Sequence, residues 1–161
     1  MYPNSTNKIR SIRMKFVDYN YWINYMDKLI IYTDGGARGN PGPAAAGVVI
    51  TDVEGKILKE YSHYLGDRTN NQAEYEAVIL GMQKAKQLRA KIIEIRIDSE
   101  LIGYQLMGKY KIKDSDLQPL FIKAWNLIQD FEKVEIKLVP REQNKRADKL
   151  VNQELDKKSL F

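Results

Sequence analysis

The amino-acid sequence predicts an α/β domain with a five-stranded mixed sheet and helices on its faces. Between residues 29 and 65, three segments with strand composition are separated by glycine-containing turns, which predicts an antiparallel meander. Two later β-rich segments are each followed by a segment of helical periodicity, which predicts strand–helix units. Together these segments give the order β-β-β-α-β-α-α-β-α.

The first two strands flank a glycine-rich turn in the run LIIYTDGGARGNPGPAAAGVVI, residues 29–50. The apolar residues 29–32 predict a buried strand, and a single acid, Asp34, stands where that strand should end. The small apolar residues 44–50 can return as its hairpin partner. A buried acid is costly unless something pairs with it. Asp34 is therefore either a turn cap or one member of a larger site.

The remaining elements follow from periodicity and from turn and cap residues. In chain order they are a strand at 56–65, a helix capped by Thr69 or Asn70, a strand at 91–98, a helix at 99–107, a helix with a capping box at Ser115 and Gln118, a strand at 134–139 and a helix capped by Asn144. Glu74 and Asp148 should fall in the opening turns of their helices. Trp125 belongs to the apolar stripe of its helix, which predicts a core position.

The chain of 161 residues is long enough for one domain, which we place at residues 28–158. Residues 1–27 differ from the rest because basic and aromatic side chains are interspersed there. Such a segment can hold nucleic acid through phosphate contacts and base stacking. We favour the simpler interpretation, a short extension that rests on the domain or is frayed.

Composition restricts the chemistry that is available. The chain has no cysteine and one histidine, which excludes disulfides, thiolate metal sites and a cysteine nucleophile, and disfavours histidine-based sites. It has no run of eighteen apolar residues and no apolar N-terminal signal segment, so we expect a cytoplasmic protein without a membrane span. The net charge of +5 favours a polyanionic partner only weakly.

Four acids share one positional logic. Asp34 and Asp98 end two strands that should be parallel neighbours, and α/β sheets place their sites at such carboxyl ends. Glu74 and Asp148 open two helices that can pack over the same edge. Converging carboxylates repel one another, so they take up protons or bind a cation. An all-oxygen ligand set selects Mg²⁺ or Mn²⁺, and it can hold two ions suited to displacement at a phosphodiester.

Four motifs in order, YTDGGARGNPGPAAAG, TNNQAEYEAVILGM, IDSELI and NKRADKLVNQELD, make the chain resemble type 1 ribonuclease H over residues 28–157. The resemblance implies the ribonuclease H fold and divalent-metal hydrolysis of the RNA strand of RNA–DNA hybrids. The products would be 5′-phosphate and 3′-hydroxyl ends. By motif, Asp34, Glu74, Asp98 and Asp148 would be the catalytic, metal-binding acids, with two Mg²⁺ ions expected and Mn²⁺ as the alternative.

The resemblance also implies a substrate-binding set in the glycine-rich loop and at the start of the following helix. These residues are Gly35, Gly36, Arg38, Asn40, Asn70, Asn71 and Gln72. Family members use this loop and the Asn-Asn pair to contact 2′-hydroxyls and the minor groove, and a 2′-hydroxyl is what separates RNA from DNA. The glycines would let the backbone approach the RNA strand closely.

Two features depart from the family pattern. Many members carry a mobile histidine shortly before the last acid, whereas this chain has Arg141 in that region. Arginine cannot shuttle protons at neutral pH, so its role would be to contact phosphate or stabilise charge, unless it is a plain surface residue. The connection at 108–115 is too short for the basic helix with which some members hold hybrids. Affinity would then depend on the extension or on Lys109, Lys111 and Lys113.

Two other functions remain open from the sequence. One is a different ribonuclease H-like nuclease, such as a resolvase or transposase core or a domain of a reverse transcriptase. The other is a nucleic-acid binding module without catalysis, which the four acids disfavour because clustered negative charge repels nucleic acid. We expect a monomer that acts on RNA–DNA hybrids. Whether it also cleaves double-stranded RNA is not determined by the sequence.

Overall fold

The computed structural model describes residues 27–160. The predicted extension therefore lies outside the described residues, apart from Asp27, and its role and its boundary with the domain stay predictions. The elements are β1 (Lys28–Ala37), β2 (Gly42–Thr51), β3 (Ile57–Arg68), α2 (Asn70–Gln87), β4 (Ile92–Ile97), α3 (Glu100–Leu106), α4 (Gln118–Ile128), β5 (Lys133–Leu138), the 3₁₀ turn η1 (Arg141–Gln143) and α5 (Lys145–Ser159).

The five strands form one mixed sheet in the order β3-β2-β1-β4-β5. The meander β1-β2-β3 is antiparallel, whereas β1 pairs with β4, and β4 with β5, in parallel. The predicted order of elements is confirmed, with η1 as an addition. Because β1 and β4 are parallel neighbours, their carboxyl ends lie at the same edge of the sheet.

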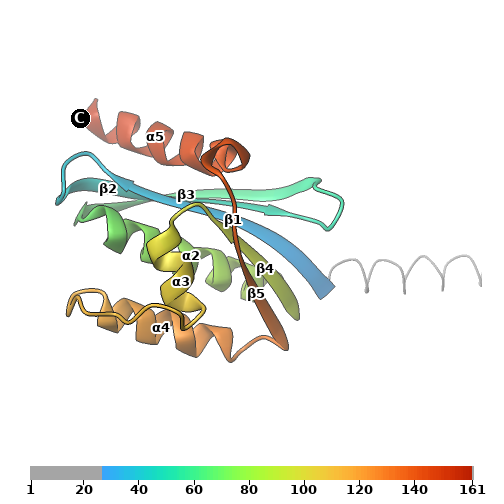
Figure 1. Ribbon diagram of the computed structural model, residues 1–161. Helices are drawn as coiled ribbons and strands as arrows, with labels where there is room; N and C mark the ends of the chain where they lie inside the picture. Colours follow the sequence, from blue (N-terminus) through green and yellow to red (C-terminus); the bar gives the residue numbers. More distant parts are fainter. Residues whose placement is uncertain (1–26, 161) are drawn as a thin grey trace, which may run out of the picture.

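Three helices cover one face of the sheet and α5 crosses the other (Figure 1). The main core lies between the sheet and α2, α3 and α4, where side chains such as Ile31, Ile79 and Ile95 are fully buried or nearly so. Burial of these apolar surfaces is the main source of the domain's stability, at roughly 25 cal/mol per Å² removed from water. The two strands that carry Asp34 and Asp98 are therefore held rigidly from this side.

Helix α5 packs directly onto β2 through a second, smaller apolar cluster of Ala45, Val151 and Leu155. Its backbone comes very close to the sheet, since a Cβ added to Gly47 would lie 2.4 Å from the carbonyl oxygen of Ala147. Gly47 is the cross-strand partner of Asp34. The absence of a side chain at Gly47 thus lets the first turn of α5 lie against β2, next to Asp34 on the neighbouring strand.

Strand β4 alternates apolar and charged residues, and its charged side chains Glu94 and Arg96 are paired with neighbours. The Glu94 side chain is 3% exposed and forms ion pairs with Lys28, Arg96 and Lys137. Arg96 also donates a hydrogen bond to the Tyr32 hydroxyl. Burial would raise the pKa of Glu94, but the hydrogen bond from Arg96 and the charge of Lys137 hold that pKa below its usual value. This face is thus polar but paired.

Helix α4 differs from the sequence prediction in two ways. It begins at Gln118 with no side-chain cap, so the predicted capping box at Ser115 is wrong. The chain before it turns instead at Asp114, whose carboxylate accepts the backbone N–H of Asp116. Trp125 is 46% exposed and stacks on Phe121, so its predicted core position is also wrong. The helix lies at the outside of the helical layer, where only Ala124 is buried within it.

Among the described residues, no helix combines the length and the apolar composition that crossing a bilayer requires.

Candidate active site

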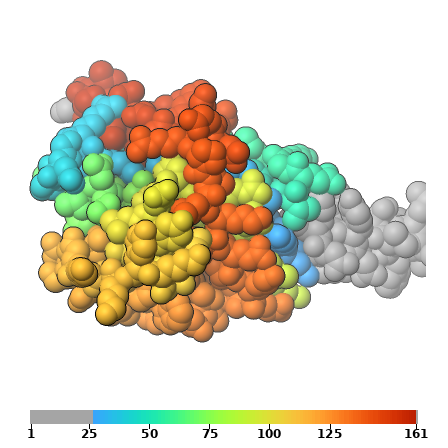
Figure 2. Space-filling view, viewed as in Figure 1, coloured from blue at the N-terminus to red at the C-terminus, as the bar shows by residue number. Residues whose placement is uncertain are grey.

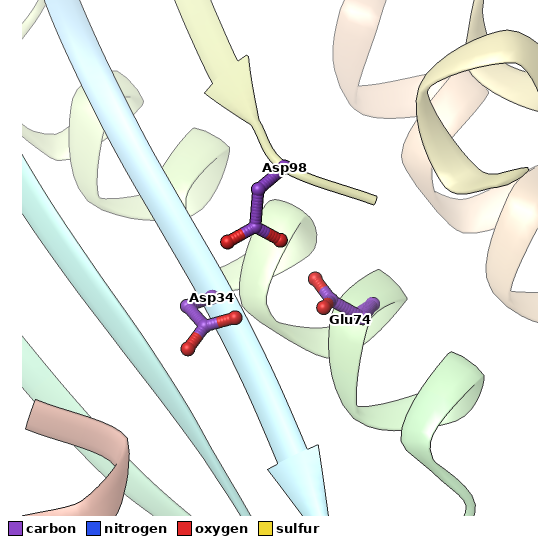
Figure 3. A group of neighbouring side chains, drawn as sticks. All are labelled: Asp34, Glu74 and Asp98. Atoms are coloured by element: carbon purple, nitrogen blue, oxygen red, sulfur yellow. The ribbon is translucent and has the colours of Figure 1, made fainter. Parts of the chain in front are cut away.

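Three of the four predicted acids converge at the carboxyl edge of the sheet. Asp34 lies within β1, Asp98 follows β4, and Glu74 extends from α2 toward both (Figure 3). One carboxylate oxygen from each residue lies within 4.8 Å of those of the other two. The argument from parallel strands thus placed Asp34 and Asp98 correctly beside each other, although the predicted end of the strand at Asp34 is wrong, since β1 stays paired with β2 as far as Ala37. Glu74 begins the second turn of α2, so the predicted position in the opening turn is wrong.

Asp148 stands at the mouth of the same cleft. It lies in the first turn of α5, as predicted, and is exposed to solvent. It is not part of the group of three, but its charge helps to raise the pKa of Asp34. The structure therefore brings all four acids to one cleft, with oxygens of three within 4.8 Å of one another and the fourth acid exposed.

The electrostatics of the group show a shortage of positive charge. Burial, followed by the charges of Asp98 and Asp148, raises the pKa of Asp34 from 3.8 to about 7. Burial and the charges of Asp34 and Asp98 raise the pKa of Glu74 well above its ordinary value, although the charge of Arg141 opposes this. Among the described residues, Glu74 Oε2 is buried without a hydrogen-bond partner.

This donor set fits a divalent metal centre. It offers only carboxylate oxygens, which Mg²⁺ and Mn²⁺ prefer, and one of these oxygens is buried and unpaired. A cation of charge +2 would offset the burial and the repulsion that together raise both pKa values. Asp34, Glu74 and Asp98 would hold such an ion directly, and Asp148 is near enough to contribute from the rim.

Gly35 sets the distance between β1 and α2. A Cβ at this position would lie 2.1 Å from the Ala73 carbonyl oxygen and 2.5 Å from the Glu74 backbone nitrogen. The helix therefore packs on the strand backbone beside Asp34 and Glu74. Gly35 is buried and admits the backbone of α2, whereas the close approach of an RNA strand at this glycine stays a prediction.

Amide side chains fix the glycine-rich loop to the start of α2. Asn70 Oδ1 accepts the backbone N–H of Ala37 at 2.9 Å, and Asn40 Oδ1 accepts the backbone N–H of Asn70 at 3.0 Å. Gln72 is engaged with Thr69 in a capping box, in which each side chain accepts the other residue's backbone N–H. Thr69 is thus the N-cap, one of the two predicted candidates.

The predicted substrate residues separate into two groups. An open cleft of about 770 Å³ contains the four acids and is also lined by Gly35, Gly36, Arg38, Asn70 and Asn71. Asn40 and Gln72 do not line it and act on the backbone instead. Arg38 is ion-paired with Asp156 of α5. Contact of any of these residues with substrate stays a prediction.

Arg141 lies in η1, in the segment between β5 and α5. Figure 2 shows the chain after β5 in orange at the surface, beside the yellow residues of α3. Arg141 is exposed and lines the cleft, and its charge lowers the pKa of Glu74. The side chain thus reaches the acids electrostatically, although its part in catalysis stays a prediction.

Sequence reasoning missed Asn144, which it treated only as a helix cap. Asn144 is 1% exposed and makes no side-chain cap bond. Its Nδ2 donates to the carbonyl oxygen of Thr33 at 2.8 Å and to Asp98 Oδ2 at 3.2 Å. Ser99 and Lys145 also line the cleft. The sequence offered only one indication of these residues, namely that Ser99 and Asn144 lie close in the chain to the predicted acids Asp98 and Asp148.

Comparison with known proteins agrees with this geometry. Residues 32–154 match the sequence profile of the family described as "Reverse transcriptase-like". The chain is 43% identical over 125 residues to "Ribonuclease HI" of Halobacterium salinarum, covering 78% of this chain and 63% of that protein. It is 39% identical over 130 residues to a bifunctional protein of Mycobacterium tuberculosis, covering 80% of this chain and 36% of that one. The chain thus spans less than two thirds of these curated relatives.

Solved structures match over nearly their whole length. The crystal structure of RNase H1 from Halobacterium salinarum superposes with a TM-score of 0.79 at 42% identity, covering 81% of this chain and 98% of that one. LC11-RNase H1, solved in complex with an RNA/DNA hybrid, gives a TM-score of 0.77 at 46% identity, covering 83% and 99%. The predicted fold is thereby confirmed, and the chain belongs to the type 1 ribonuclease H family.

Proposed function

We propose that this protein is a metal-dependent endonuclease that hydrolyses the RNA strand of RNA–DNA hybrids and leaves 5′-phosphate and 3′-hydroxyl ends. The observation that carries the proposal is the group of Asp34, Glu74 and Asp98, whose carboxylate oxygens lie within 4.8 Å of one another in an open cleft. A relative of 46% identity has been crystallised with such a hybrid, which supports the substrate class.

The acids make this cleft suitable for phosphodiester hydrolysis only with bound cations. We propose two Mg²⁺ ions, with Mn²⁺ as the alternative. When bound, the ions supply Lewis-acid stabilisation of the charge that develops on the attacking and departing oxygens. Water adds to phosphorus, the bond from phosphorus to the 3′ oxygen breaks, and that oxygen takes up a proton.

The remaining residues would bind and orient the duplex. Asn70 and Asn71 open α2 at the edge of the cleft, where their amides can contact 2′-hydroxyls and base edges. The bonds that join Asn40, Asn70 and Ala37 hold the loop rigid, so less conformational entropy is lost when substrate binds. To bind a phosphate, Arg38 would break its ion pair with Asp156 or contact both groups at once.

The direct test uses three labelled substrates: a hybrid, an RNA duplex and a DNA duplex of the same sequence. We expect cleavage of the RNA strand of the hybrid with Mg²⁺ or Mn²⁺, no cleavage after EDTA treatment, and no cleavage of DNA. Cleavage of the DNA duplex would instead indicate a resolvase- or transposase-like nuclease. Hybrid binding without cleavage under any metal condition would indicate a binding module. The RNA duplex decides whether double-stranded RNA is also a substrate.

Arg141 gives a second prediction. Because its charge reaches Glu74 and it lines the cleft, Arg141→Ala should lower kcat about 100-fold, the lower end of the loss when one transition-state donor is removed. Arg141→Lys should restore part of that loss, since it keeps the charge but not the planar fork. The measurement is steady-state hybrid cleavage, with Lys157→Ala on the far end of α5 as a control. Equal rates for Arg141→Ala and the wild type would mean that Arg141 is a plain surface residue without a part in catalysis.

We also propose that the protein acts as a monomer in the cytoplasm. A chain without cysteine is compatible with a reducing compartment. All four acids come from one chain, so the cleft needs no second copy to complete its acidic set.

A further inference from the structure

Asn144 is a buried polar residue at the junction of the three elements that carry Asp34, Asp98 and Asp148. It is 1% exposed and precedes α5 directly. Its side chain reaches two of these elements through Thr33 and Asp98, and its backbone carbonyl accepts the N–H of Asp148 at 3.2 Å. A single residue therefore has contacts to β1, to the end of β4 and to the first turn of α5.

The chemistry of these contacts requires an amide at this position. The Thr33 carbonyl oxygen and Asp98 Oδ2 are both acceptors, so the group between them must donate two hydrogen atoms in fixed directions. The Asn144 NH₂ group does this. Aspartate would present acceptors only, and alanine would present neither. The bond to Asp98 is also charge-assisted when that carboxylate is ionised, which makes it stronger than a neutral bond.

The arrangement is not optimal for stability alone. Among the described residues, Asn144 Oδ1 is buried without a hydrogen-bond partner. An unpaired buried acceptor costs about 1–3 kcal/mol. As a helix cap, the side chain would have satisfied a backbone N–H of α5, yet it makes no such bond. Its orientation therefore serves the Asp98 carboxylate rather than the helix.

We propose that Asn144 is a positioning residue: it orients the Asp98 carboxylate and fixes α5 against β1, so that the acids form one cation-binding geometry. This inference rests on the proposed function of the same cleft. Residues that orient metal ligands typically contribute 10- to 100-fold in metal affinity or activity. Asn144→Ala should thus weaken Mn²⁺ affinity and lower kcat by about that factor, while KM for the hybrid changes less than about twofold. Asn144→Asp should be at least as impaired, since it sets a fifth carboxylate against Asp98.

The control must also lose a buried hydrogen bond, but one away from the acids' oxygens. The Tyr75 hydroxyl donates to Gln105 Oε1 at 2.8 Å between α2 and α3, and Tyr75 is fully buried. Tyr75→Phe should therefore lower the melting temperature and leave Mn²⁺ affinity and kcat within about twofold of the wild type, since the loss of this bond affects stability alone.

The experiment compares the full-length wild type, Asn144→Ala, Asn144→Asp and Tyr75→Phe by Mn²⁺ calorimetry and by steady-state cleavage. The proposal is supported if the two Asn144 variants lose Mn²⁺ affinity and kcat and Tyr75→Phe does not. Wild-type Mn²⁺ affinity in Asn144→Ala, or equal losses in Tyr75→Phe, overturns it even if the melting temperature falls. Should the wild type fail to cleave hybrids, the proposed function fails, and the Mn²⁺ affinities still decide the role of Asn144.

Discussion

Asp34→Asn should abolish hydrolysis of the hybrid while leaving the fold intact. The substitution keeps the shape of the side chain but removes one of the three carboxylates whose oxygens lie within 4.8 Å. We expect a rate below about one-thousandth of the wild type, which corresponds to a barrier higher by about 4 kcal/mol. The measurement is single-turnover cleavage at saturating Mg²⁺, with the fold checked by circular dichroism.

The same variant should be more stable than the wild type when metal is absent. The pKa of Asp34 is about 7 in the folded state, against an ordinary value of 3.8. Since the folded carboxyl holds its proton more tightly, the wild type loses stability as pH rises from about 4 to about 7, and the loss is complete above that range. Asparagine does not titrate, so Asp34→Asn should gain on the order of 2–4 kcal/mol above pH 7 and show a flatter pH profile.

A suitable control removes a carboxylate outside the cleft. Asp130 is exposed at the end of α4 and pairs with Lys86. Asp130→Asn should retain full activity and the wild-type dependence of stability on pH, because an exposed ion pair contributes about 0–1 kcal/mol. Near wild-type cleavage by Asp34→Asn, or a lower stability above pH 7, would refute the assignment of Asp34.

Gly35→Ala should have the largest structural effect of any small substitution near the site. The new Cβ would lie 2.1 Å from the Ala73 carbonyl oxygen, and backbone on both sides leaves no flexible side chain to yield. We expect a loss of about 3 kcal/mol or more in the free energy of unfolding, at or above the upper end for overpacking. Helix α2 must move away from β1, so Glu74 also leaves the group of acids and activity falls with stability.

Gly36 offers a matched control for this substitution. A Cβ at Gly36 would meet only the Val151 Cγ1 atom, at an ordinary 3.4 Å. Urea unfolding of the two alanine variants should therefore show a large loss for Gly35→Ala and a change of less than about 1 kcal/mol for Gly36→Ala. Similar losses in both variants would mean that Gly35 does not set the distance between strand and helix.

The meeting of Asp34 and Asp98 could be predicted because parallel strands bring their carboxyl ends together. Both acids stand at or near the end of an apolar, β-rich run. Their meeting could therefore be predicted from those runs and from the parallel strands that strand–helix units form. Thr69 was likewise identifiable as a cap from residue type. These features depend on local sequence or on the direction of the chain, and both are visible without coordinates.

Features that depend on packing across the sequence could not be predicted. Gly35 was visible as a glycine, but nothing local indicates that it contacts Ala73 of α2 rather than a ligand. Asn144 has the residue type of a cap, and only the fold brings Thr33 and Asp98 to its amide. Trp125 fits an apolar helical stripe, yet its exposure depends on α4 lying at the outside of the helical layer.

The central claim is that the acids of this cleft bind a divalent cation. The most direct test is the melting temperature of the metal-free protein at about pH 8 as Mg²⁺ is added, for the wild type and Asp34→Asn. A ligand that binds only the folded state stabilises it by RT ln(1 + [L]/Kd). The melting temperature of the wild type should rise steadily with Mg²⁺ concentration. The melting temperature of Asp34→Asn, which is higher at the start, should stay constant. Equal increases in both proteins, or no increase in the wild type, would contradict the metal centre.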